Sequence, residues 1–235
     1  MIREDEGLRE RKKQQTRTLI AETARSLFGE RGFEAVTVAE VARAADVSDA
    51  TVFNYFPSKE DLFYSGLEVF EEALLAAIRE RPPGDSVLAA FGRFVLEPRG
   101  LLAAKDPEAI ERLAATTRVI AESPALQARE RQILERYATS LAALLAEETG
   151  ASADAVEPRV AATSLLGVHR ALIEYSRGQI LAGVRNPLLA RRVRRQGRQA
   201  LGLLEGGLGA YAVKEAGSPS TARVEREHGE GRHHR

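Results

Sequence analysis

The 235-residue chain contains no cysteine. Disulfides and thiolate metal sites are therefore excluded, and the composition suits a reducing compartment. No apolar run approaches the roughly 18 residues that a membrane-spanning helix needs. The first residues, MIREDEG, also lack the apolar stretch of a signal peptide. We therefore expect a cytoplasmic protein with no membrane partner.

The chain also lacks an excess of charge of either sign. It has 34 lysine and arginine residues against 34 aspartate and glutamate residues. Residues 1–64 carry twelve acidic and ten basic residues. Bulk charge therefore gives no argument for binding to nucleic acid, and such an argument must rest on where individual charges lie.

The motifs of common enzyme classes are missing too. The sequence has no nucleophile elbow, no P-loop, no dinucleotide fingerprint and no H-E-x-x-H motif. His228, His233 and His234 fall in a polar terminal segment, which we interpret as an unstructured end and not as a metal site. We therefore expect no enzyme, no catalytic residue, no metal site and no cofactor.

What is abundant points to helices. Ala, Leu, Arg and Glu dominate, while runs of β-branched residues are scarce, which indicates an all-α fold. Thr37 followed by Glu40 forms a capping box, and Ser48 and Ser58 are further N-caps. About nine helices are expected; the first ends near residue 31, and the others begin near residues 37, 48, 58, 86, 107, 124, 154 and 187.

Composition divides the chain into four segments. Residues 1–11 are polar and are expected to be a disordered arm. Residues 12–72 form an N-terminal three-helix domain, and residues 73–212 form a C-terminal helical domain. Residues 213–235 are rich in Gly, Ser, Glu and Arg and are expected to be a disordered tail.

The stretch 37–56 has the pattern of a helix-turn-helix, in which a second short helix is presented to DNA. Asp46 occupies its turn, and Asp tolerates the left-handed backbone region. A basic cluster precedes the domain and is either a solvated helix start or an arm that lies along phosphates: Arg9, Arg11, Lys12, Lys13 and Arg17.

Four sequence patterns occur at fixed spacing in this region. They are A-x-x-L-F-x-x-x-G-F-x-x-x-T-V over residues 24–38, V-A over 41–42, V-S over 47–48, and Y-F-x-S-K-E-x-L-F over 55–63. In these patterns residues 12–72 resemble the DNA-binding domain of TetR-type transcriptional regulators. The C-terminal part is similar to that family only in its layout.

The resemblance implies that the chain binds a double-stranded DNA operator. Ala50, Thr51 and Asn54 would face base edges, and Tyr55 and Lys59 would reach phosphates. Free N–H groups at helix N-termini would support the phosphate contacts. The full set of expected DNA-contacting residues is Thr37, Val38, Ser48, Asp49, Ala50, Thr51, Phe53, Asn54, Tyr55 and Lys59.

Two of these residues allow more than one interpretation. Asp49 either stabilises the N-terminus of its helix in the free protein or accepts a hydrogen bond from the exocyclic amine of cytosine. Phe53 either belongs to the core, which we prefer, or stacks on a sugar.

The last two long helices, near 154–181 and 187–204, have more apolar and small surface than one core needs. We expect each to pair with its symmetry mate in a homodimer, as the resemblance also implies, and we expect Gly197→Glu to weaken that dimer. Seven arginines and no acid lie between Tyr175 and Leu204. They form either a solvated face, an anion site such as one for an acyl-coenzyme A, or a second DNA contact.

The resemblance further implies a pocket in the C-terminal domain for a small-molecule effector, hydrophobic or acyl-coenzyme A-like. The expected function is a ligand-responsive homodimeric repressor that is released from a palindromic operator. The alternatives are a helical interaction module or an activator without small-molecule control. Six candidate pocket residues, each of which is alternatively a satisfied core or interface residue, are Phe91, Phe94, Arg118, Tyr137, His169 and Tyr175.

Overall fold

The computed structural model describes residues 2–97, 103, 106–152 and 154–214, with residues 2–8, 10 and 68 described only by their backbone. These described residues form eleven α-helices and no strand, so the predicted all-α class is confirmed. Most of the expected tail, with its three histidines, lies outside the described residues.

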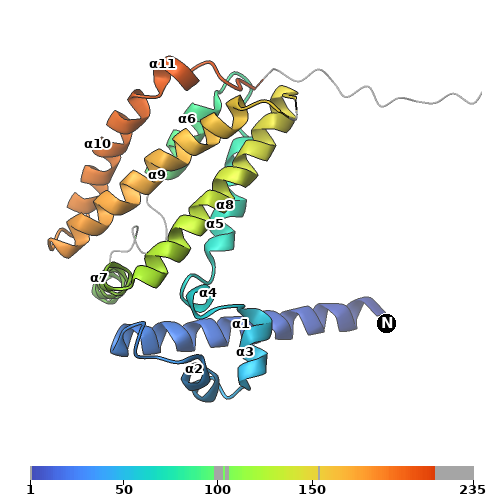
Figure 1. The fold of residues 1–235 in the computed structure, drawn as a ribbon, viewed down its shortest axis with the longest axis vertical. Coiled ribbons are helices and arrows are strands. Elements are labelled where there is room, and N and C mark those ends of the chain that lie inside the picture. The colour runs from blue at the N-terminus through green and yellow to red at the C-terminus, as the bar shows by residue number, and fades with distance from the viewer. Residues whose placement is uncertain (1, 98–102, 104–105, 153, 215–235) are drawn as a thin grey trace, which may run out of the picture.

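The helices form two groups (Figure 1). At one end, α1 (Ile2–Arg31) lies across α2 (Val38–Ala44) and α3 (Asp49–Tyr55). The short α4 (Lys59–Phe63) connects this end to the larger group, in which α8 runs beside α9, and α10 packs on α6 and α9. The larger group consists of α5 (Leu67–Arg79), α6 (Val87–Leu96), α7 (Pro107–Glu122), α8 (Pro124–Thr149), α9 (Glu157–Leu181), α10 (Leu188–Gly202) and α11 (Glu205–Leu208).

The first helix is longer than predicted. Residues 1–11 were expected to be a disordered arm, but α1 is helical from Ile2 onward. The segment is rich in Arg, Glu and Lys, which are good helix formers. Extending an existing helix avoids the cost of nucleation, so a polar sequence can continue α1 without burying a face of its own.

The predicted start of α2 is confirmed in detail. The backbone N–H of Glu40 donates to Thr37 Oγ1 at 3.2 Å, and the backbone N–H of Thr37 donates to Glu40 Oε2 at 2.8 Å. This hydrogen bond from the Thr37 backbone, together with the neighbouring Arg31, lowers the pKa of Glu40 to about 2. The carboxylate thus stays charged, and the cap is lost only as the pH falls from the usual range of Glu toward 2.

The turn that sets α3 against α2 also follows the sequence. Asp46 adopts a left-handed backbone with φ of 54°, which matches its tolerance for that region. Ser48 then caps α3, because its side chain accepts from the N–H of Thr51. Phe56 ends the helix in an extended conformation immediately before Pro57.

One predicted helix is divided in two. A single helix was expected between the starts near residues 58 and 86, but α4 ends at Phe63 and α5 begins at Leu67. Gly66 lies between them with φ of 93°, in the region that disfavours side chains. Because α5 packs on α6 and α8, we propose that the domain boundary lies at residues 64–66 and not at residue 72.

A buried arginine closes the far end of the larger group. Arg81 follows α5 and is only 3% exposed. Its guanidinium makes an ion pair with Glu148 at the end of α8, at 2.6 Å, and donates to Ala212 O at 2.9 Å. Lys214 also bonds through its backbone to Asp85, at 3.1 Å. Residues 213–214 are therefore attached to the domain, although they were expected to belong to the tail.

The small-residue stripe of α10 faces inward. An added Cβ at Gly197 would overlap Leu96 Cδ2 and would lie 3.2 Å from a methyl group of Leu172. Leu189 and Leu201 on the same helix are buried. This stripe therefore packs against α6 and α9 of its own chain, and the prediction that Gly197 lies in a dimer interface is wrong. Gly197→Glu would insert a carboxylate into the domain and would test its packing, not its association.

Candidate nucleic-acid interface and ligand cavity

Helix α3 is anchored on one side and exposed on the other. Val52 is fully buried beneath it, and Phe56 at its end is 2% exposed. Ala50 and Asn54 lie on the exposed side. The small side chain of Ala50 leaves room for a close approach, and the amide of Asn54 offers both a donor and an acceptor.

Phe53 lies on the same exposed side. The ring is 51% exposed, so the preferred prediction that it belongs to the core is wrong. On a seven-residue helix only two turns are available, and Val52 already fills the inward position. An exposed aromatic ring beside Asn54 is the kind of apolar group that stacks on nucleic acid.

The polar residues at the starts of α2 and α3 already have partners within the chain. Ser48 Oγ lies 2.8 Å from Thr51 Oγ1, and Thr37 Oγ1 donates to Glu40 Oε2 at 2.9 Å. Asp49 is exposed in the first turn of α3, where a carboxylate complements the helix dipole. This exposed position fits both interpretations of Asp49.

Two further predicted DNA-contacting residues are only partly exposed. Val38, the first residue of α2, and Tyr55, the last residue of α3, both pack against the core. Their exposed parts lie at the ends of the two short helices.

Lys59 is directed into the protein. Its ammonium group donates to Phe33 O at 2.8 Å and to Val36 O at 3.0 Å, and it lies 4.1 Å from the centre of the Phe33 ring. These contacts join the start of α4 to the loop between α1 and α2. Its two carbonyl partners assign Lys59 a structural role, and its phosphate contact stays a prediction.

Several acids of this half of the chain point toward the other helices or toward α1. Glu34 accepts from Ser123 Oγ at 2.7 Å, Asp61 pairs with Arg129 at 2.6 Å, and Glu40 pairs with Arg31 at 2.8 Å. These carboxylates are thereby bound away from the exposed side of α3. Residues 1–64 carry more acidic than basic residues, but these three carboxylates do not hinder the approach of α3 to DNA.

The basic cluster lies on α1. Arg11, Lys12 and Lys13 are exposed, and the guanidinium of Arg17 lies 5.1 Å from the centre of the Phe56 ring, where α3 ends. The N-terminal half of α1 extends past α3 (Figure 1). The cluster is therefore presented by a helix that flanks α3 and not by a disordered arm.

A mostly apolar cavity of about 330 Å³ lies where α5, α7, α8 and α9 meet the linker after α4. Its volume is at the lower end of the range of small-molecule sites. Tyr64, Ser65 and Leu67 line it from the linker and the start of α5. Ser65 Oγ is buried and has no hydrogen-bond partner among the described residues.

An aromatic stack lines part of this cavity, and only two of its three residues were predicted from the sequence. Phe70 stacks on His169 with ring centres 4.9 Å apart and on Tyr137 at 5.8 Å. Burial lowers the pKa of His169 to about 4, so its imidazole is neutral near pH 7. Phe70 was missed as a pocket residue because its spacing on α5 is that of an ordinary core position.

The six predicted pocket residues separate into different environments. Tyr137 and His169 line the cavity, and Phe94 contacts it indirectly through Phe70, at 5.3 Å between ring centres. Phe91 is fully buried in the core, and Arg118 is exposed. Tyr175 lies on another side of α9, beside arginines of α10.

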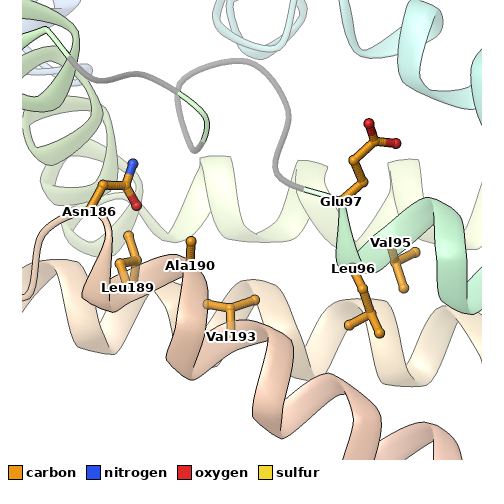
Figure 2. Close-up of a pocket in the computed structure, with 7 residues that line it drawn as sticks. All are labelled: Val95, Leu96, Glu97, Asn186, Leu189, Ala190 and Val193. Carbon is orange, nitrogen blue, oxygen red and sulfur yellow. The ribbon is translucent and has the colours of Figure 1, made fainter.

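A smaller pocket lies between the end of α6 and the start of α10 (Figure 2). Its volume of about 40 Å³ is far below that of a site for a drug-sized molecule. Leu96, Leu189 and Val193 line it, together with the polar Asn186. This pocket is therefore too small for such a molecule, unlike the cavity next to the linker.

The cavity is in contact with the α4 segment through α8. Tyr64, which lines the cavity, donates its hydroxyl proton to Leu126 O at 3.0 Å. Three residues farther along α8, Arg129 holds Asp61 of α4. Helix α8 therefore contacts both Tyr64, which lines the cavity, and Asp61 of α4.

Two classes of site are missing from the described residues. No group of three His, Cys, Asp or Glu side chains in that part of the chain has the arrangement of a metal site. None of the described helices is long and apolar enough to cross a membrane.

Known protein families match both the N-terminal and the C-terminal part of the chain. The family of bacterial regulatory proteins called tetR matches residues 20–65, and the MftR C-terminal domain matches residues 81–195. The transcriptional regulator TcmR of Streptomyces glaucescens is 31% identical over 150 residues, which are 63% of this chain and 66% of TcmR. The matched part is thus just under two thirds of the length of TcmR.

Two other similarities come from a nucleoid occlusion factor and from a solved structure. SlmA of Vibrio vulnificus strain YJ016 is 28% identical over 151 residues, which are 63% of this chain and 76% of SlmA. The crystal structure of the transcriptional regulator FadR from Bacillus subtilis in complex with stearoyl-CoA has 21% identity and a TM-score of 0.50. It covers 80% of this chain and 96% of the FadR chain, and at that identity it shows a shared fold.

The first prediction concerns Lys59. We expect Lys59→Met to keep the length of the side chain but to lose two hydrogen bonds from a charged donor, which lowers the free energy of unfolding by about 2 kcal/mol. Urea denaturation followed by circular dichroism measures this loss without DNA. Lys12→Met, at an exposed position of α1, is the control and should change stability little. Equal stability of the two variants would show that the Lys59 contacts contribute nothing to the fold.

Proposed function

This chain belongs to the TetR family of bacterial transcriptional regulators, and we propose that it is a homodimeric repressor that a small molecule releases from a palindromic operator. It is a DNA-binding regulator and not an enzyme. One observation carries the proposal: an apolar cavity borders the linker that attaches the exposed α3 to the rest of the chain.

We propose that α3 enters the major groove. Asn54 can pair with adenine, and Phe53 can contact a thymine methyl group or a sugar. Arg11, Lys12 and Lys13 on α1 then lie along the flanking phosphates. The helix starts at α2 and α3 supply backbone N–H groups to further phosphates.

The second prediction tests this surface. We expect Asn54→Ala to reduce the preference for operator over unrelated DNA by about 1–3 kcal/mol, because one base contact is lost. Fluorescence anisotropy with duplexes from the DNA flanking the gene measures both affinities. Lys12→Ala is the contrasting variant. It should weaken binding to both duplexes alike and reduce the slope of log affinity against log salt concentration by about one unit. If Asn54→Ala weakens binding to the two duplexes equally, Asn54 does not contribute to sequence specificity.

Dimerisation is proposed through an exposed stripe on α9. Val156 is 67% exposed and Val160 is 57% exposed, and Gly167 and Ala171 continue the same side of the helix. A single helix-turn-helix makes few base contacts, whereas two modules on a twofold axis double them and fix the half-site spacing. Apolar and small residues on the exposed side of this helix suit such a self-complementary contact.

The third prediction tests this stripe. We expect Val160→Glu to shift the protein from dimer to monomer in sedimentation velocity experiments, because two carboxylates would meet near the twofold axis. Val69→Glu on α5 is the control, since Val69 is 67% exposed and lies on another helix. A Val160→Glu protein that stays dimeric at micromolar concentration would place the interface elsewhere.

The effector is proposed to bind in the cavity beside the linker. A ligand releases DNA only if it binds the DNA-incompetent conformation more tightly. The position of the cavity supports this proposal, because Tyr64 and Ser65 line it and belong to the linker that would move. An apolar effector fits the lining, and the unpaired hydroxyl of Ser65 can bond one polar atom of it.

An acyl-coenzyme A-like effector is a narrower version of this proposal. The FadR structure contains stearoyl-CoA, and in the present chain Arg191, Arg195 and Arg198 are exposed on α10. The other arginines of the seven have different contacts: Arg192 bonds Gln179 at 2.6 Å, for example. The exposed trio therefore serves as a solvated face unless an anionic ligand reaches it.

The fourth prediction locates the effector. We expect compounds that raise the melting temperature in a screen of metabolites, drugs and coenzyme A esters to lose that effect in Ile173→Trp. Ile173 lines the cavity, so the larger ring would occupy the space of the ligand. Val69→Trp adds the same ring at an exposed position and should leave the shifts unchanged. Compounds that still stabilise Ile173→Trp bind elsewhere.

A further inference from the structure

A second cavity, polar and of about 350 Å³, adjoins the apolar one. Glu130 and Leu134 of α8 line both cavities, so the two share a wall. On α9, His169 and Ile173 face the apolar cavity, and Arg177, one turn after Ile173, faces the polar one. One elongated molecule could therefore extend from one space into the other if it displaced the side chains between them.

An ion pair stands at this shared wall. Arg177 donates to Glu130 through both terminal nitrogens, at 2.7 Å and 3.2 Å, and each side chain is 17% exposed. The guanidinium thus offers its flat fork to a carboxylate in the geometry that favours two parallel hydrogen bonds. A carboxylate that arrives from a ligand can take the same place.

The charge of the polar cavity favours an anion over a cation. Its lining has three arginines, Arg131, Arg170 and Arg177, but only two acids, Glu130 and Glu174. Arg170 and Glu174 pair with each other at 2.9 Å. One positive charge is therefore in excess, and a ligand with one negative charge would balance it.

We propose that the effector is an amphipathic carboxylate, with its hydrocarbon part in the apolar cavity and its carboxylate on Arg177 in place of Glu130. This inference rests on the proposed function, since it specifies the chemical class of the effector for the same site. Binding breaks one ion pair and forms another. It leaves Glu130 at the edge of the cavity that Tyr64 of the linker also lines, so the exchange takes place next to the segment that must move.

The test uses the full-length protein and four probes with the same eight-carbon chain: octanoate, octanol, octylamine and octanoyl-coenzyme A. Isothermal titration calorimetry measures their affinities, and anisotropy of labelled operator DNA measures release separately. We expect octanoate to bind about tenfold more tightly than octanol or octylamine, the difference that one bidentate charged contact supplies. Octanoyl-coenzyme A distinguishes a free carboxylate from a thioester with distant phosphates, and it should bind more weakly than octanoate.

Two variants break the same ion pair and are expected to act in opposite directions. Arg177→Gln should lower the affinity for octanoate about tenfold and leave the affinity for octanol unchanged, because the partner of the carboxylate is gone. Glu130→Gln should strengthen octanoate binding severalfold, because the competing carboxylate is gone. A purely structural role of the pair would change both affinities in the same direction. Arg170→Gln, at a more exposed arginine of the same cavity, is the control and should change octanoate affinity less than either.

The outcomes separate the two proposals. Equal binding of the four probes, preference for octylamine or octanoyl-coenzyme A, no binding of any probe, or parallel changes in the two variants would overturn the carboxylate assignment. If octanol or octanoyl-coenzyme A nevertheless released operator DNA, the proposal that a small molecule releases the repressor would still stand. If octanoate binds as expected but operator DNA stays bound, the carboxylate site stands and the proposed release mechanism fails.

Discussion

The ammonium group of Lys59 joins two parts of the chain that lie on either side of α2 and α3. By binding the carbonyls of Phe33 and Val36, this group fixes the loop between α1 and α2 to the start of α4. Asp61, two residues later, is held by Arg129 of α8. The short helix α4 is therefore attached on one side to the loop between α1 and α2, and on the other side to α8 of the larger group.

This arrangement explains why the cavity lies where it does. The chain leaves α4 through Gly66, whose left-handed backbone permits a sharp change of direction. The residues beside it, Tyr64 and Ser65, line the cavity, so a ligand would meet the joint between the two groups directly. Farther away, the buried Arg81 ties the ends of α5 and α8 together and gives the larger group a rigid far end.

The sequence predicted local features well and assembled features poorly. The capping box at Thr37 needs only neighbouring residues, so its signal is complete within one turn. The break at Gly66 was missed because apolar spacing continues across it, and Phe53 was misplaced because two helical turns hardly define a face. The stack of Phe70 on Tyr137 and His169 joins three helices, and no pattern along one helix can report such a meeting. The roles of the DNA-contacting residues stay predictions.

The outward orientation of Phe53 has a practical consequence for spectroscopy. The chain has no tryptophan, so its own fluorescence comes from five tyrosines. A tryptophan placed at position 53 would be the single indole of the molecule and would stand in water on the free protein. Its emission maximum would move to shorter wavelength when the ring leaves water. Position 53, which was predicted to lie in the core, is therefore a suitable site for a fluorescent reporter of DNA binding.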